Sequence, residues 1–174
     1  MLRISAQARI SPLADIEDSV KGSTIEIADG VAIDSFVKIK PAGGPGDVTI
    51  GAGTTINSGC VIYTGNGVAI GKGCAIAANC TFAPVNHEYR DADRPIAAQR
   101  FMASRGGIVV EDDVWIGANS VILDGAVLGK GCVVGAGSVV RGRLRPYSVN
   151  VGSPTREIGM RGAGSRRPET VARG

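Results

Sequence analysis

The chain has 174 residues, which suits one domain, and 26 of them are glycine. Because glycine destabilises helix interiors, this density argues against a helical bundle, while 44 % hydrophobic residues argue against a disordered linker. The whole formal net charge of +3 lies in residues 156–174, so the neutral remainder is a poor electrostatic match for nucleic acid. No apolar run approaches the roughly 18 residues of a membrane span, and the first residues lack a secretory pattern. We therefore expect a cytoplasmic protein without membrane insertion.

Aliphatic residues recur at every sixth position along most of the chain. In chain order the runs are Ile4, Ile10 and Ile16; Ile25, Val31 and Val37; Ile50, Ile56 and Ile62; Ile70, Ile76 and Phe82; and Val110, Ile116, Ile122, Leu128, Val134 and Val140. A period of six matches neither the 3.6-residue turn of a helix nor a heptad. It indicates short strands joined by tight corners, with each aliphatic side chain pointing inward. Stacked coils then pair their strands in parallel, about 4.8 Å apart.

Small side chains occupy a second position, four residues after each inward aliphatic residue. They are Thr54, Cys60, Cys74, Cys80, Val114, Ser120, Ala126, Cys132 and Ser138. All four cysteines of the chain fall in this position. The pattern predicts that they are small buried side chains rather than metal ligands or disulfide partners.

The six-residue period breaks between Phe82 and Val110. The intervening segment, APVNHEYRDADRPIAAQRFMASRGG, is polar and contains two prolines, so we expect an extruded loop over about residues 83–109. It carries His87, the only histidine of the chain. Histidine is the side chain whose ordinary pKa suits proton abstraction near neutral pH, so we expect acid–base chemistry in this loop.

The repeat, its interruption and two later motifs, VWIGANSVILDGAVLGKGCVVGAGSVV and VGSPTR, resemble the hexapeptide-repeat acyltransferases. The resemblance is to the maltose, galactoside and lipopolysaccharide-modifying sugar O-acetyltransferases. It implies an all-β, left-handed parallel β-helix over residues 1–160, with one extruded loop and a short C-terminal helix or tail. Residues 161–174 would form a flexible basic tail. The resemblance also implies a homotrimer in polysaccharide biosynthesis, with acetyl-CoA as co-substrate and a sugar or sugar-nucleotide acceptor.

The same resemblance implies catalytic residues. His87 takes the place of the family's general base, which removes the proton of the acceptor hydroxyl. Asn57, at the second position of its repeat, matches an asparagine that lines the acceptor site, where it can hydrogen-bond the acceptor or the oxyanion. Asn79 and Tyr89 are further candidates for lining the acceptor pocket. A histidine base usually needs an acceptor for its other ring nitrogen, and three loop acids are available: Glu88, Asp91 and Asp93.

Two groups of residues are implied in acetyl-CoA binding. They are Gly117, Ala118 and Ala136 for the pantetheine arm, and Arg141 and Arg156 for the nucleotide phosphates. Trp115 is expected to pack beside the pantetheine groove. Arg156 lies in the matching VGSPTR motif, whereas Arg141-Gly142 stands where many relatives have Thr-Lys after the paired valines. The individual phosphate contacts are therefore open, although the local positive charge is kept.

Other functions are weighed against this one. The zinc carbonic anhydrases of the same fold need three histidines and this chain has one, so they are excluded and no metal is expected. An amino-sugar nucleotide is an alternative acceptor, which would make the reaction an N-acetylation. A non-catalytic β-helix scaffold is the remaining alternative, but a scaffold has no need of the loop or of the VGSPTR ending.

Overall fold

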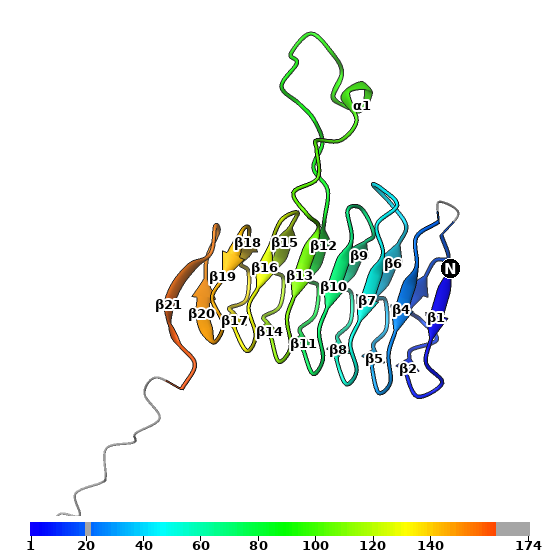
Figure 1. Cartoon of the computed structure of the whole chain (residues 1–174), viewed down its shortest axis with the longest axis vertical. Coiled ribbons are helices and arrows are strands. Elements are labelled where there is room, and N and C mark those ends of the chain that lie inside the picture. Colours follow the sequence, from blue (N-terminus) through cyan, green and yellow to red (C-terminus); the bar gives the residue numbers. More distant parts are fainter. Residues whose placement is uncertain (20–21, 163–174) are drawn as a thin grey trace, which may run out of the picture.

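Three sheets form the three faces of a triangular prism in the computed structural model, which describes residues 1–19 and 22–162 (Figure 1). Face A contains, in spatial order, β1 (Leu2–Ile4), β4 (Ile25–Ile27), β7 (Val48–Ile50), β10 (Val68–Ile70), β13 (Ile108–Val110), β16 (Val127–Leu128) and β19 (Arg143–Leu144). Face B contains β2 (Arg9–Ile10), β5 (Ala32–Ile33), β8 (Thr55–Ile56), β11 (Ala75–Ile76), β14 (Trp115–Ile116), β17 (Val133–Val134), β20 (Ser148–Val151) and β21 (Arg156–Met160). Face C contains β3 (Asp15–Ile16), β6 (Lys38–Lys40), β9 (Val61–Tyr63), β12 (Thr81–Ala83), β15 (Val121–Leu123) and β18 (Val139–Val140). The predicted all-β architecture, a left-handed parallel β-helix, is confirmed.

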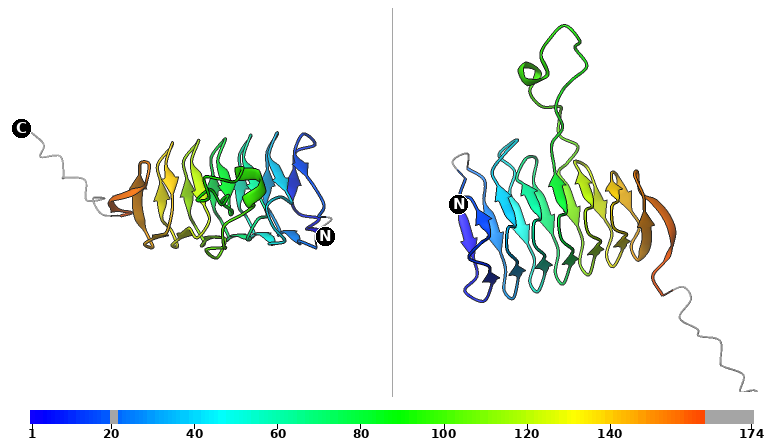
Figure 2. Two further views of the ribbon diagram at one scale, coloured as in Figure 1. Left: turned by 90° about the horizontal axis from the view of Figure 1, so that it is seen from above. Right: turned by 180° about the vertical axis from the view of Figure 1, so that it is seen from behind.

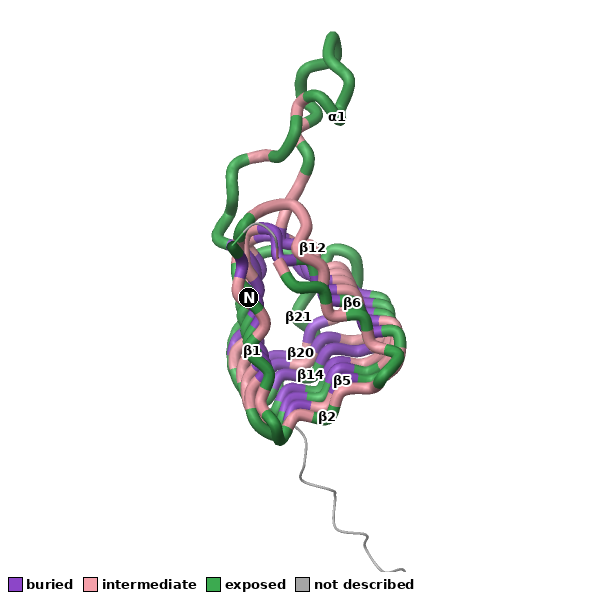
Figure 3. Tube along the Cα trace, turned by 90° about the vertical axis from the view of Figure 1, so that its right-hand side faces the viewer, coloured by how far each residue is buried: buried purple, intermediate pink, exposed green. Residues whose placement is uncertain are grey.

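The core runs along the axis of the prism, where the buried residues of successive coils stack (Figure 3). Every predicted inward aliphatic residue from Ile50 to Val140 is at most 3 % exposed, and so is every small residue of the second position. Register partners show the stacking: Phe82 lies between Ile62 and Ile122 on face C. Removal of these side chains from water is the main favourable contribution to folding.

One run of aliphatic residues takes a different register from the one that its spacing suggested. Ile25 pairs with Val48, whereas Ile27 pairs with Ile50. The run that begins at Ile25 therefore fills the small-residue position, and Ile27, Ile33 and Ile39 fill the aliphatic position. The reason is that a three-residue strand points its first and third side chains to the same side, and β4 has isoleucine at both.

The four cysteines are buried, as predicted. Burial raises the pKa of the Cys132 thiol to about 12 and also raises the pKa of Cys74. Both thiols are therefore protonated at neutral pH, and the thiol is a far weaker nucleophile than the thiolate.

We expect the native protein to react with a thiol-selective reagent at pH 7 much more slowly than a free cysteine does. The reason is the combination of burial and raised pKa, since reaction needs both access and the thiolate form. A spectrophotometric assay should count all four thiols only after denaturation. A thiol that reacts in the native protein at the rate of free cysteine would show that the small-residue position is open to solvent.

The extruded loop comprises residues 84–107 and leaves the prism between β12 and β13, close to the predicted limits (Figure 1, Figure 2). It starts at the corner where face C passes into face A. It contains α1 (Ile96–Gln99), the one helix of the described residues, and no helix among those residues is long and apolar enough to cross a membrane.

A short helix or tail was expected at the C-terminus, and the described residues there form the strands β20 and β21. β21 folds back antiparallel onto β20, the last parallel strand of face B, and pairs with its backbone. A strand edge left open exposes unpaired backbone groups, which explains why the chain returns here. Arg161, expected in the flexible tail, lies with Nη1 2.7 Å from Oδ2 of Asp113. Residues 163–174 of the expected tail lie outside the described residues.

Candidate functional site

His87 lies at the neck of the extruded loop, where the outgoing and returning chains pair. Residues 86–88 and 100–102 exchange two backbone hydrogen bonds of 3.0 and 2.8 Å, and an isolated bridge joins His87 to Phe101. The two rings pack with centroids 4.8 Å apart at 47°. The imidazole is exposed on the loop rather than buried in the prism. It is therefore held by its backbone and by one aromatic neighbour while its edge stays accessible.

Two hollows meet at this imidazole. The first, of about 480 Å³, opens toward the later coils and is lined by His87, Tyr89, Met102, Arg105, Asp124 and Arg141 among others; we call it the basic hollow. The second, of about 280 Å³, opens toward the earlier coils and is lined by Gly43, Tyr63, Val85, His87 and Phe101 among others; we call it the aromatic hollow. One accessible base between two hollows is an arrangement that suits a reaction between two substrates.

Asp124 fastens the returning end of the loop to the prism. Its carboxylate accepts backbone N–H groups from Arg105 at 2.9 Å and Gly107 at 3.0 Å, and the side-chain amide of Asn66 at 3.2 Å. The residue is only 4 % exposed. Hydrogen bonds to a buried carboxylate are stronger than neutral ones, so Asp124 connects three successive coils at the corner where the loop interrupts the repeat.

Asp124→Ala should loosen the neck of the loop. It removes the acceptor of three N–H groups, and we expect the local free energy of opening to fall by about 2 kcal/mol, or roughly a 30-fold faster amide exchange. Hydrogen exchange measured by mass spectrometry over residues 104–108 checks this. The matched control is Asp112→Ala, because Asp112 accepts one backbone N–H, from Lys72 at 2.7 Å, at another corner of the prism. Equal exchange of the loop in both variants would contradict the assignment.

None of the three loop acids orients the imidazole of His87. Glu88 accepts the backbone N–H groups of Tyr89 and Arg90, and these bonds, that of Arg90 first, hold its pKa below its usual value. Asp91 accepts the backbone N–H of Asp93. In the part of the chain that the structure describes, no side chain hydrogen-bonds to the ring of His87. Both ring nitrogens are thus left for a substrate, a water or another molecule.

The other predicted acceptor-site asparagines lie at a different corner, where face B passes into face C. Asn57 directly follows β8, and its side-chain amide donates to the carbonyl of Ile76 at 2.8 Å. Asn79 lies one coil further, with a left-handed φ of 59°. Neither asparagine lines the basic or the aromatic hollow, whereas Tyr89 lines the basic hollow. Within one chain, His87 and Asn57 are therefore not brought together.

The predicted pantetheine residues continue the corner of the two asparagines. The backbone bond from Asn119 N–H to Ala78 C=O, and that from Gly137 N–H to Ala118 C=O, stack Ala118 and Ala136 above Ala78, the residue before Asn79. Gly117 leaves no room for a side chain, since a Cβ there would lie 2.5 Å from the Ala136 nitrogen.

The remaining predicted acetyl-CoA residues are spread over the later coils. Trp115 is 53 % exposed on face B of the same coil as Ala118. Arg156 is exposed at the start of β21. Arg141 lies instead at the corner of the loop and lines the basic hollow with His87. The structure therefore separates Arg141 from the predicted pantetheine groove of its own chain.

Sequence reasoning missed Asp124, Arg105 and Asn66. A signal was present, because Leu123 is the register partner of Ala83, the last residue before the loop. Asp124, the residue after Leu123, therefore lies at the corner from which the loop departs. Aligning the sequence of one coil with that of the next identifies this corner. The hydrogen bonds of Asp124 depend on the path by which the loop returns to the prism, and the loop sequence has no periodic pattern from which that path could be predicted.

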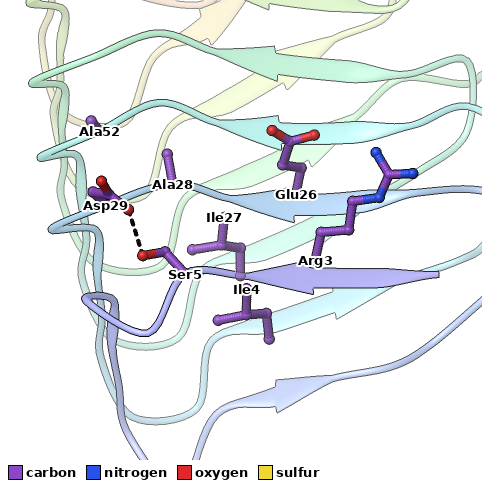
Figure 4. Close-up of a pocket in the computed structure, with 8 residues that line it drawn as sticks. All are labelled: Arg3, Ile4, Ser5, Glu26, Ile27, Ala28, Asp29 and Ala52. Atoms are coloured by element: carbon purple, nitrogen blue, oxygen red, sulfur yellow. Dashed lines mark hydrogen bonds between the residues drawn. The ribbon is translucent and has the colours of Figure 1, made fainter.

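A further hollow, of about 510 Å³, lies on face A of the first two coils, away from the loop (Figure 4). Its charges are Arg3 and Glu26, which are register partners on β1 and β4, together with Asp29. The Ser5 hydroxyl donates to Asp29 at 2.5 Å. No histidine or cysteine lines this hollow, so it offers no general base of the kind found at the loop.

Two repeat families match the chain. Residues 107–142 match "Bacterial transferase hexapeptide (six repeats)", and residues 47–81 match "Hexapeptide repeat of succinyl-transferase". These segments flank the extruded loop and cover four of the coils that surround the candidate site.

Curated relatives are acetyltransferases. The "Probable acetyltransferase" of Mycobacterium tuberculosis is 33 % identical over 92 residues, which are 50 % of this chain and 30 % of that protein. A tetrahydropyridine-dicarboxylate N-acetyltransferase of Brevibacillus brevis is 53 % identical over 51 residues, which are 29 % of this chain and 22 % of that protein. The chain thus matches less than a third of the length of either relative.

Solved structures share the fold over most of the chain. A serine-to-alanine mutant of AntD, an N-acyltransferase from Bacillus cereus, in complex with dTDP-4-amino-4,6-dideoxyglucose and coenzyme A, has a TM-score of 0.77 at 26 % identity, covering 91 % of this chain and 83 % of AntD. The acetyltransferase VCA0836 from Vibrio cholerae, in complex with acetyl-CoA, has a TM-score of 0.60 at 25 % identity, covering 92 % of this chain and 69 % of that one. In its repeats and its fold, the chain is similar to the hexapeptide-repeat acetyltransferases.

Proposed function

We propose that the protein transfers an acetyl group from acetyl-CoA to an amino or hydroxyl group of a sugar-containing acceptor, with His87 as general base. The observation that carries the proposal is the accessible imidazole at the meeting point of two hollows. One hollow receives the thioester and the other the acceptor, so the base lies beside both reacting groups. Acetyl-CoA and coenzyme A in the VCA0836 and AntD complexes support the choice of donor.

In the proposed reaction the acceptor O–H or N–H proton moves to a ring nitrogen of His87. The acceptor oxygen or nitrogen bonds to the thioester carbon, and the C–S bond then breaks. The imidazolium returns its proton to the departing thiolate, so the enzyme ends as it began. His87 can take and return this proton because no other side chain among the described residues hydrogen-bonds to its ring, which leaves the ring nitrogens available.

The comparisons favour an amine over a hydroxyl as the acceptor group. AntD is an N-acyltransferase crystallised with an amino-sugar nucleotide, and the Brevibacillus relative is an N-acetyltransferase. We therefore place N-acetylation of an amino sugar or its nucleotide ahead of O-acetylation of a sugar, which the sequence resemblance put first. A scaffold role has no observation in its favour.

A second copy of the chain would complete the site. His87 lies at the corner between faces C and A, whereas Ala118, Ala136 and Asn57 lie at the corner between faces B and C. An acetyl-CoA bound along the second corner reaches an imidazole at the first only if the two corners come from adjacent chains. This separation supports the homotrimer expected from the resemblance.

A factorial acceptor panel tests the proposal. Purified protein, acetyl-CoA and one of glucose, glucosamine, glucose 1-phosphate or glucosamine 1-phosphate are mixed, and thiol release is followed with product mass. We expect thiol release above the acceptor-free background, with the amine acceptors leading the hydroxyl acceptors. Thiol release that stays at background with all four acceptors would contradict the proposal, as would failure of the folded protein to bind acetyl-CoA.

A further inference from the structure

The basic hollow carries an excess of positive charge that its own chain does not neutralise. Arg105 and Arg141 both line it and both are exposed. Three arginines of the described residues pair with acids, namely Arg90 with Glu88, Arg145 with Glu157 and Arg161 with Asp113. Among residues 1–19 and 22–162, no acidic side chain lies within ion-pair distance of Arg105 or Arg141. Neither guanidinium group forms an ion pair or a hydrogen bond within that part of the chain, so the N–H donors of both are free for a ligand of the hollow.

Asp124 carries the one carboxylate that lines the basic hollow, and this carboxylate does not pair with either arginine. Its two oxygens accept the backbone N–H groups of Arg105 and Gly107 and the amide of Asn66, and the residue is 4 % exposed. It thus holds the backbone of Arg105 in place without engaging its guanidinium. The two arginines against this one carboxylate leave the hollow with a net charge of about +1.

We propose that Arg105 and Arg141 form an anion subsite that selects acceptors carrying a phosphate or carboxylate group close to the reacting amine or hydroxyl. The proposal rests on the proposed function, since it assigns the acceptor class of the same site. A guanidinium presents a planar fork of N–H donors that matches the oxygens of phosphate and carboxylate. Ile96, Met102 and Leu123 line the same hollow and offer apolar contact to the uncharged part of such an acceptor.

The phosphates of coenzyme A do not suit this subsite. When the thioester is beside His87, the pantetheine arm with its two amides separates the phosphates from the reacting carbon. A group that reaches Arg105 and His87 in one hollow must therefore belong to the acceptor or to the acyl chain itself. A carboxylate on the acyl chain has the same chemistry, so the experiment must distinguish the two sources.

Direct binding tests the subsite without any turnover. Inorganic pyrophosphate is titrated by calorimetry into the wild type, into the double variant R105Q/R141Q, and into the control R100Q/R143Q. The first double variant keeps the backbone N–H that Asp124 accepts, and the control removes two exposed arginines that line neither hollow. We expect affinity to fall at least about tenfold in R105Q/R141Q and to stay within about twofold of wild type in the control. Equal affinity in all three proteins would overturn the anion subsite.

Kinetics then identify the source of the anion. With acetyl-CoA, we expect kcat/KM for glucosamine 1-phosphate to exceed that for glucosamine at least about tenfold, and R105Q/R141Q to abolish this preference. If the wild type prefers succinyl-CoA to acetyl-CoA and does not distinguish the two acceptors, the anion belongs to the acyl chain and our assignment to the acceptor is overturned. Equal use of both acceptors and both donors overturns the subsite while leaving the acyltransferase proposal intact. Arginine-dependent pyrophosphate binding without any acetyl transfer has the opposite meaning: the subsite stands and the proposed function fails.

Discussion

His87→Ala is expected to lower kcat/KM for acetyl transfer at least about a hundredfold, the low end of what a general base contributes. The ring is the one group of the described residues placed between the two hollows with both nitrogens free for a substrate. Acetyl-CoA binding should stay within about twofold of wild type, because the predicted pantetheine residues lie at another corner. Steady-state thiol release and calorimetric titration with acetyl-CoA measure the two quantities.

The control for this variant is Arg100→Gln. Arg100 is in the same loop neck and exposed, but its side chain lines neither hollow, so activity should be unchanged. Because His87 is itself exposed, its replacement should leave the thermal midpoint of the protein close to wild type. Full activity in a folded His87→Ala protein would exclude His87 as the base.

Phe82→Ala is expected to have the largest effect on stability, about 3–5 kcal/mol of the free energy of unfolding. Phe82 is fully buried and fills the aliphatic position of the coil from which the loop departs. Its register partners Ile62 and Ile122 would border the cavity that remains. Equilibrium unfolding in urea, followed by circular dichroism, measures the change.

Val109→Ala is the matched control for the core variant. Val109 lies on β13, the strand that resumes the prism after the loop, but it is 36 % exposed on the outside of face A. Its replacement should cost less than about 1 kcal/mol. If both variants lost the same free energy, the inward position of Phe82 would not be the source of its contribution.

The periodic part of the molecule could be predicted from the sequence because one local rule repeats. Ile116 and Cys132, for example, are buried where the six-residue spacing places them. The rule failed at Ile25, since a strand with isoleucine at both inward positions fits two registers that the spacing does not distinguish. It also gave no information on the C-terminus, where β21 pairs by backbone rather than by pattern.

The candidate site could be predicted only in part, for a different reason. His87 could be selected as a candidate because it is the sole histidine and lies where the period breaks. Its grouping with Asn57 was not supported within one chain, because Asn57 follows a strand of face B and His87 follows a strand of face C, so that they lie at different corners of the prism. Asp124 and Arg105 meet through the path of a loop without a period, so their contact depends on three-dimensional structure.

Proton NMR of the imidazole tests the central claim most directly, since the chain has a single histidine and its ring signals need no assignment by mutation. The protein is titrated with acetyl-CoA and then with glucosamine 1-phosphate while the two carbon-bound ring protons of His87 are observed. We expect each ligand to shift these signals in a saturable manner, because each occupies a hollow that His87 lines. Ring signals that stay unchanged at saturating concentrations of both ligands would show that acetyl transfer does not take place at this residue.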